Sequence, residues 1–265
     1  MKLSPALRDF LVKHSDLIDN NNFQELYLEA FFNEPRIEDR ELTWVLIHSN
    51  IDFLSHMTEI PHHCFKGLDI KGIFIPPSIR EISYNAFTDC KSLINVEISD
   101  GVEWIWDYAF SSCTALKRII LPDSVTNIRN GIFMDCTSLE SVSIGKNIHI
   151  LPEEAFYGCE SLSHIDIPTN ITGIAPNAFS ESGLETLKVP HSVGELNNIV
   201  TGCQKLREIY IPYLRSPADF ATYQFRKCPQ LTDIYFEGTE ENWRDIVHYP
   251  GEIRKSIKIH FNVKY

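Results

Sequence analysis

Apolar positions recur along most of this chain at a spacing of 23 residues. The phenylalanines of this series are Phe87, Phe110, Phe133, Phe156 and Phe179. A cysteine follows each of the first four by three residues, and a leucine follows each cysteine by three more. A short alternating apolar run then closes the unit, often at a proline, which offers no donor to a strand ladder. The repeating unit reads V-x-x-I-x-x-x-A-F-x-x-C-x-x-L-x-x-I-x-I-P.

This period predicts a solenoid, because one short coil cannot bury its own apolar side chains and neighbouring coils must stack to share a core. Each L-x-x-I-x-I segment alternates in the way typical of a strand. The predicted strands of a parallel sheet begin near Ile70, Leu93, Leu116, Leu139, Leu162, Leu184, Leu206 and Leu231. We expect the other side of each coil to be irregular, with the Phe rings stacked as a buried spine. The predicted fold class is an α/β repeat solenoid with about eight short strands.

The outer repeats depart from the consensus. Cys64 and Phe65 take the Ala-Phe place in the first coil, and the turn at Ser182-Gly183-Leu184 is one residue short. Val200 replaces the phenylalanine of its coil, and Phe225 follows it only after 25 residues. Local curvature is therefore expected to change in the last coils.

These repeats resemble the BspA-like class of bacterial leucine-rich repeats, whose copies carry the same A-F-x-x-C-x-x-L-x-x-I-x-I-P pattern. The resemblance covers roughly residues 60 to 247 and implies a leucine-rich repeat fold. The segment GTEENWRDI at 238–246 resembles the closing turn and helix that often follow the last repeat in this family. The resemblance implies adhesion, host-protein binding or another role. It does not choose among them, because a fold by itself does not determine a function.

Both ends of a solenoid need covering, because they expose core and strand edges. Residues 1–59 are expected to form a helical acidic cap, 60–236 the repeat solenoid and 237–265 a short C-terminal cap. Helical apolar stripes begin near Ser4-Pro5, Asn22 and Asp39, and Trp243 is expected to pack over the last coil. Ile257, Ile259 and Phe261 alternate like a final strand.

The net charge of the chain indicates what kind of partner to expect. The chain has 24 Lys and Arg against 36 Asp and Glu, a formal net charge of −12. Because nucleic-acid binding depends on neutralising phosphates, we expect no direct nucleic-acid contact but a protein partner with a basic patch. Arg8 and Asp9 interrupt the place where a signal peptide needs an apolar stretch, and no long uncharged run suits a membrane span. The expected location is cytoplasmic.

Little in the sequence suggests catalysis or cofactor binding. The cysteines occur once per coil rather than in the close pairs of metal sites, so we expect free thiols that fill a buried stack, although adjacent coils would also suit a disulfide. His56, His62, His63 and Cys64 form the only local cluster of metal-capable residues, and solvent or backbone contacts are the simpler expectation. With no recognised catalytic motif, we predict no enzyme, no cofactor and no metal.

The outward positions of the predicted strands form two lanes across the sheet, because side chains alternate along a strand. The lanes vary in chemistry while the core positions repeat, which favours a recognition surface. The candidate protein-binding residues are Phe74, Arg118, Ile120, His164, Asp166, Lys188, Glu208, Tyr210, Asp233 and Tyr235. Tyr210 and Tyr235 with acidic neighbours suit a Lys or Arg of the partner through cation–π contact and charge, so the C-terminal half is expected to bind most strongly.

Three functions remain open on the sequence. The first is a non-catalytic protein-interaction module that binds through the concave sheet. The second is an acidic inhibitor or mimic, of phage or mobile-element type, that blocks the basic groove of a nucleic-acid enzyme, which charge alone suggests. The third is a bacterial surface adhesin, which the resemblance suggests.

Overall fold

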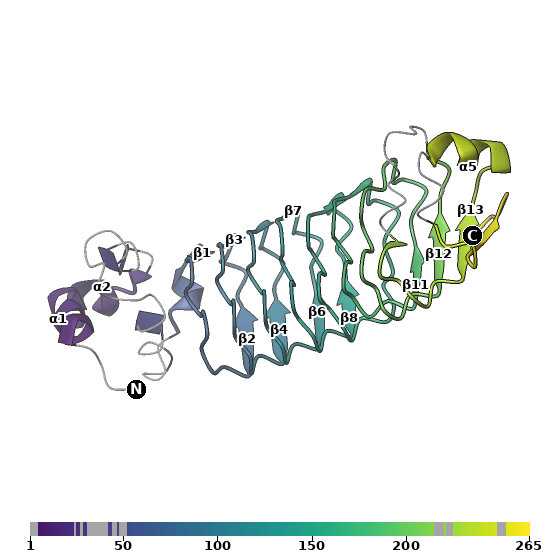
Figure 1. Cartoon of the computed structure of the whole chain (residues 1–265). Helices are drawn as coiled ribbons and strands as arrows, with labels where there is room; N and C mark the ends of the chain where they lie inside the picture. The colour runs from purple at the N-terminus through teal and green to yellow at the C-terminus, as the bar shows by residue number, and fades with distance from the viewer. Residues whose placement is uncertain are drawn as a thin grey trace.

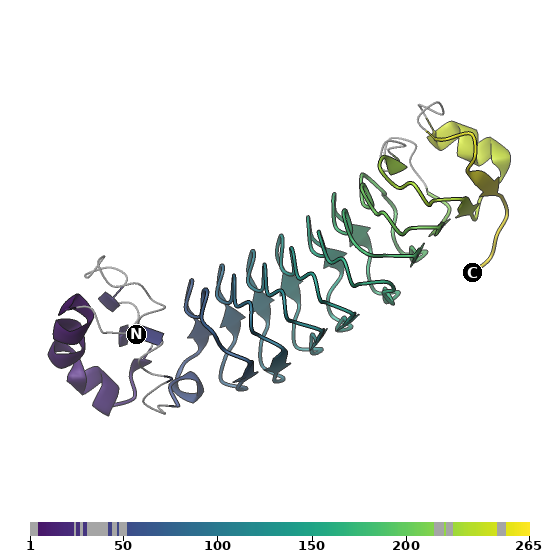
Figure 2. The same cartoon turned by 60° about the horizontal axis from the view of Figure 1, so that its bottom comes forward.

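Stacked coils give the molecule an elongated shape (Figure 1). The computed structural model describes residues 5–23, 25–26, 29–30, 42–43, 47, 52–214, 220, 225–247 and 253–265. Short helices stand at the N-terminal end, and helix α5 lies beside the last strands at the other end (Figures 1 and 2). The predicted repeat solenoid is confirmed.

One column of parallel strands runs along the solenoid in three hydrogen-bonded sheets of two, two and four strands, and we name the whole column the main sheet. Its strands are β2 (Gly72–Ile75), β4 (Asn95–Ile98), β6 (Arg118–Ile120), β8 (Ser141–Ser143), β11 (Thr186–Lys188), β12 (Glu208–Ile211), β13 (Asp233–Phe236) and β14 (Lys258–His260). Paired residues are equivalent positions of neighbouring repeats, such as Ile209 with Ile234. The final strand expected near Ile257 is confirmed as β14.

The coil after Leu162 departs from this column. Residues 162–167 are not a strand, although Ile165 is buried and its neighbours His164 and Asp166 point outward as predicted. The strand expected here is therefore missing.

A second column of parallel strands lies along another edge of the solenoid (Figure 1). Its members are β1 (Glu59–Ile60), β3 (Glu81–Ile82), β5 (Trp104–Ile105), β7 (Asn127–Ile128), β9 (Ile150–Leu151) and β10 (Gly173–Ile174). Single bridges extend it to Leu196 and Phe220. The expectation of an irregular side is wrong, because two-residue strands are too short to show an alternation in the sequence. We name the outward side of this column the short-strand face.

The predicted phenylalanine spine is confirmed in the core between the two columns. The centroids of successive rings from Phe65 to Phe179 lie 4.7, 5.0, 5.9, 5.7 and 5.5 Å apart, with interplanar angles of 21° or less. All these rings are buried. The spine thus joins consecutive coils through aromatic stacking as well as apolar burial.

The cysteines form a second buried column beside the spine, and all seven are free thiols. Six of them donate a hydrogen bond to the backbone carbonyl at the Phe position of the preceding coil, as Cys113 does to Phe87 at 3.2 Å and Cys136 to Phe110 at 3.1 Å. The expected buried packing is confirmed. The thiol adds a second hydrogen bond to a carbonyl that already accepts one from the backbone, as the Phe87 carbonyl does from the Cys90 N–H at 3.1 Å.

We expect the central thiols to resist alkylation in the native protein. Burial raises the pKa of the Cys90 thiol to about 12 and raises the pKa of Cys113 and Cys136 well above its usual range. Because only the thiolate reacts, iodoacetamide at pH 8 should leave these residues unmodified until urea unfolds the chain. Peptide mass spectrometry measures this. Labelling of Cys136 in the folded protein at the rate of a free thiol would contradict the buried column.

Helices lie at both ends of the solenoid where the structure describes them (Figure 1). The first predicted helix is divided at His14 into α1 (Pro5–Lys13) and α2 (Ser15–Asp19). Most of the third predicted helix, from Asp39 to His48, lies outside the described residues. At the other end, α5 (Glu240–Ile246) begins with a capping box at Thr239. It places Trp243 against Phe220 and Phe236, at 5.4 and 5.2 Å between ring centroids.

Candidate protein-interaction surface

The main sheet places eight of the ten predicted binding residues on its outward side, whereas His164 and Asp166 face outward from a segment without strand structure. Strands β4, β6 and β12 bury alternate residues, so that Arg118 and Ile120 face solvent on either side of buried Ile119. Phe74 pairs with Glu97 across β2 and β4, and Glu208 and Tyr210 pair with Asp233 and Tyr235 across β12 and β13. The structure therefore brings neighbouring candidates together in lanes, as the alternation predicts.

The N-terminal half of this face carries large apolar side chains in water. Phe74 is 53% exposed and Ile120 is 65% exposed, and Ile94, at the turn before β4, is 49% exposed. Exposed Glu97 belongs to the same lane, between Phe74 and Ile120 in repeat order. Apolar side chains gathered with a charged neighbour on one sheet are typical of a contact surface.

Further along the sheet, His164 and Asp166 contact each other on one face of their segment. The His164 Nε2 and Asp166 Oδ1 atoms are 2.9 Å apart, and the Asp166 side chain is 97% exposed. Both side chains lie at the surface, where they form a polar pair.

The C-terminal half carries a ladder of stacked side chains in one lane. Lys188 Nζ lies 5.3 Å from the centroid of the Tyr210 ring. The Tyr210 and Tyr235 rings stack at 4.4 Å with an interplanar angle of 11°, and Tyr235 stacks on His260 at 4.5 Å. Each member comes from the next strand in order, from β11 to β14. The register of identical repeat positions thus builds a rigid ladder.

This ladder changes how the tyrosines can meet a partner. The two rings face each other, and Lys188 and His260 cover their outer faces. The cation–π contact expected from a partner's Lys or Arg is therefore already made by Lys188 within the chain. What remains available at this patch is the edges and hydroxyl groups of the rings.

The acidic neighbours of the ladder are also engaged. The Tyr210 hydroxyl donates to Glu208 Oε2 at 3.3 Å, and Asp233 Oδ1 lies 2.7 Å from His260 Nε2. The hydrogen bond with His260 holds the pKa of Asp233 below its usual range, whereas burial and the nearby Glu208 raise the pKa of Tyr210. At neutral pH the patch therefore presents a charged Asp233 carboxylate and neutral tyrosine hydroxyls.

Sequence reasoning missed the end of the chain as part of this surface. Tyr265 packs edge-on against Tyr210 at 5.2 Å and donates its hydroxyl hydrogen bond to the Val189 carbonyl at 2.8 Å. Its ring also stacks on His191, which contacts Glu237 at 3.0 Å. The repeat pattern does not predict these contacts, because they join positions between 46 and 76 residues apart.

Sequence reasoning also missed an aromatic pair on the short-strand face. Trp104 and Trp106 stack at 5.4 Å with an interplanar angle of 20°. The signal for them was present, since both replace smaller residues at outward positions of the repeat. They were overlooked because this side of the coil was expected to be irregular.

The residues of the metal-capable cluster near the first coil contact different neighbours. His63 meets the edge of Tyr84 at 5.7 Å, whereas buried Cys64 lies 3.3 Å from the Thr43 hydroxyl. Over the ranges that the structure describes, no group of three or more His, Cys, Asp or Glu side chains is suited to hold a metal ion. Within the same ranges, none of the helices has the length and apolar character that crossing a membrane requires.

The fold and this surface define a leucine-rich repeat protein. The family model of the BspA-type leucine-rich repeat region, with six copies, matches residues 35–159 and 126–249. The chain belongs to this BspA-type family. Leucine-rich repeat proteins are typically non-enzymatic binding modules, and the repeat fold suggests a protein-interaction role.

Several solved structures are similar to the chain, whereas no curated protein matches it. A leucine-rich cell surface protein from Faecalibacterium prausnitzii is 27% identical, with 72% of this chain and 54% of that chain covered and a TM-score of 0.44. A leucine-rich repeat protein from Bacteroides ovatus is 22% identical, with 77% and 64% covered and a TM-score of 0.44. The pneumococcal vaccine antigen PcpA is 14% identical, with 78% and 71% covered and a TM-score of 0.37. The chain spans between half and two thirds of the first two structures.

Proposed function

We propose that this chain is a non-catalytic protein-interaction module that acts in the cytoplasm and binds a partner protein through the main sheet. The observation that carries the proposal is the exposure of Phe74 and Ile120 in one lane of that sheet. A soluble sheet face normally presents polar side chains, and large exposed apolar residues become anchors when a partner removes them from water.

The charges of the same face indicate the chemistry of the partner. Exposed Glu97 and Asp166 accompany the apolar residues, and the chain as a whole carries a net charge of −12. A partner that presents apolar side chains flanked by Lys or Arg complements this surface in shape and in charge. The Tyr210–Tyr235 ladder extends the contact by its ring edges and hydroxyls, and its stacking fixes those groups before binding.

Capture from source-cell lysate by the tagged chain, at low and at high salt, tests the proposal. We expect the Phe74→Ala, Ile120→Ala double variant to weaken partner binding about 30-fold, the effect of losing roughly 2 kcal/mol at central anchors. The control is Val12→Ala, which removes an exposed apolar side chain from α1, away from the sheet. Binding should persist at high salt because apolar contacts carry much of it.

Three outcomes decide against parts of this proposal. Loss only in the Tyr210→Ala, Tyr235→Ala variant would place the binding energy at the C-terminal ladder rather than at Phe74 and Ile120. Unchanged capture in both double variants would contradict binding through the main sheet. Capture that vanishes at high salt for every variant, and that nucleic acid competes away, would favour an acidic mimic of nucleic acid instead.

A further inference from the structure

The short-strand face holds an arginine in a fixed position. The guanidinium carbon of Arg129 lies 5.6 Å from the ring centroids of both Trp104 and Trp106. The Trp106 indole is itself held, because its Nε1 donates to Glu81 Oε2 at 3.0 Å. Three successive coils thus contribute one residue or pair each to a single cluster. Stacking on two aromatic rings limits the rotamers of Arg129 before any ligand arrives.

Arg129 makes no ion pair within the described part of the chain. Its side chain is exposed, and no carboxylate of residues 52–214 or of the other described segments lies within ion-pair distance. A guanidinium is always charged and presents its N–H donors in a planar fork that fits a carboxylate. This position is therefore suited to bind an acidic side chain from outside.

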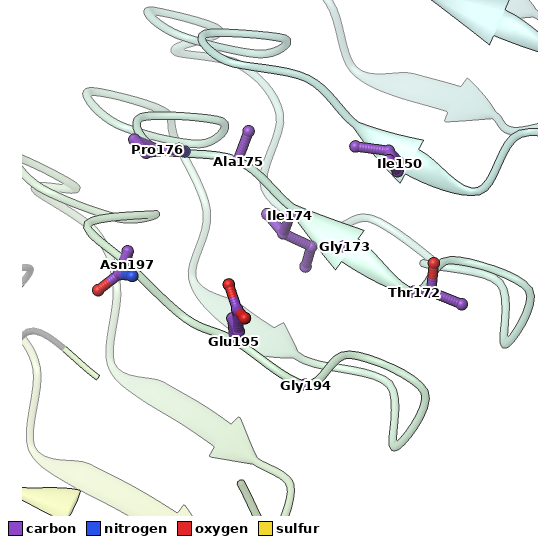
Figure 3. A pocket seen from close by; sticks show the side chains of 9 residues that line it. All are labelled: Ile150, Thr172, Gly173, Ile174, Ala175, Pro176, Gly194, Glu195 and Asn197. Atoms are coloured by element: carbon purple, nitrogen blue, oxygen red, sulfur yellow. The ribbon is translucent and has the colours of Figure 1, made fainter. Parts of the chain in front are cut away.

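A hollow continues from Arg129 along the same face. Arg129, Ile150 and Ala175 line its first part, and Ile150, Gly173 and Glu195 line the second. Figure 3 shows Ile150, Gly173 and Glu195 on successive coils around this second part. A Cβ atom added to Gly173 would meet only the Ile150 side chain, at 3.7 Å. The space over the Gly173 backbone, at the bottom of the hollow, is therefore free for a ligand side chain. Ile150 is 58% exposed and forms an apolar wall.

We propose that the short-strand face binds an extended segment of a partner protein, which presents a carboxylate to Arg129 and an aliphatic side chain to the hollow over Gly173. Arg129 follows β7 and Gly173 begins β10, two coils further on. Two rungs of about 4.8 Å each and an offset of two residues along the strand separate their backbones by roughly 12 Å, the length of about three to four residues of extended chain. The segment thus has its acidic and aliphatic residues about three positions apart. This ligand is opposite in charge to the partner proposed for the main sheet, and neither proposal depends on the other.

Fluorescence anisotropy with labelled Gly/Ser peptides that carry Leu and Glu three positions apart, in both orders, tests this proposal. We expect saturable binding to the full chain, weaker by about tenfold or more in Arg129→Gln, which removes the charge, and in Gly173→Val, which fills the hollow. Arg244→Gln removes an exposed arginine from α5, outside both proposed surfaces, and should leave peptide binding unchanged. Replacement of Glu by Lys, or of Leu by Ser, in the peptide should weaken binding similarly.

The proposal is overturned if the Lys peptide binds as well as the Glu peptide, or if none of the peptides binds at millimolar concentration. It is also overturned if Arg129→Gln, with an unchanged melting temperature, binds like the wild type. Sedimentation of the chain alone tests whether a second copy of the chain occupies this face. A dimer that Arg129→Gln converts to a monomer would show that a second copy, and not a partner segment, occupies this face.

Discussion

Replacement of Phe133 by alanine is expected to lower the free energy of unfolding by about 3–5 kcal/mol, the cost of removing a large buried side chain without refilling its space. Phe133 is fully buried and stacks between Phe110 at 5.9 Å and Phe156 at 5.7 Å. The change therefore interrupts the spine in its middle. The coils on either side would lose their shared ring contacts, and stability in a solenoid depends on these contacts between neighbours.

Urea unfolding followed by circular dichroism measures this loss. Phe74→Ala is the matched control, because it removes the same side chain from a position that is 53% exposed and should change stability by about 0.5 kcal/mol or less. An equal effect of the two substitutions would show that the spine does not hold the coils together. A second transition in the Phe133 variant would show that the two halves of the solenoid unfold separately.

The second large effect is expected at Gly183, in the shortened turn. A Cβ atom there would lie 2.0 Å from the Glu160 carbonyl oxygen and 2.7 Å from its carbon. These are backbone atoms that cannot rotate away, so Gly183→Ala should force the two coils apart and lower the free energy of unfolding by about 3 kcal/mol or more. The Gly183 N–H donates to the Cys159 carbonyl at 3.0 Å, and separation of the coils would weaken this hydrogen bond.

Thermal and urea unfolding of Gly183→Ala, compared with Gly194→Ala, check this expectation. An added Cβ at Gly194 meets nothing within 4 Å, so the control should stay within about 0.5 kcal/mol of the wild type. If Gly183→Ala were as stable as the control, the close approach of the two coils would not exist in solution.

The candidate site was only partly predictable from the sequence. Strand alternation placed Phe74 and Ile120 outward and put Tyr210 beside Tyr235, because the repeat register carries equivalent residues to adjacent strands. Strand alternation does not predict which side chains lie against the faces of the Tyr210 and Tyr235 rings. Lys188 and His260 cover the tyrosines only because β11 and β14 join the same sheet on either side of β12 and β13.

The 23-residue period by itself determined the solenoid, the main sheet, the phenylalanine spine and the buried cysteines. A repeated coil has one way to bury its repeated apolar positions, so local pattern and global fold agree. Only the tertiary structure decided the contacts between residues that the period does not relate. Tyr265 packs against Tyr210. The structure also shows that the coil after Leu162 forms no strand, although its sequence fits the repeat. Arg129 lies against Trp104 and Trp106 because of a second column of strands, which are too short to show an alternating pattern in the sequence.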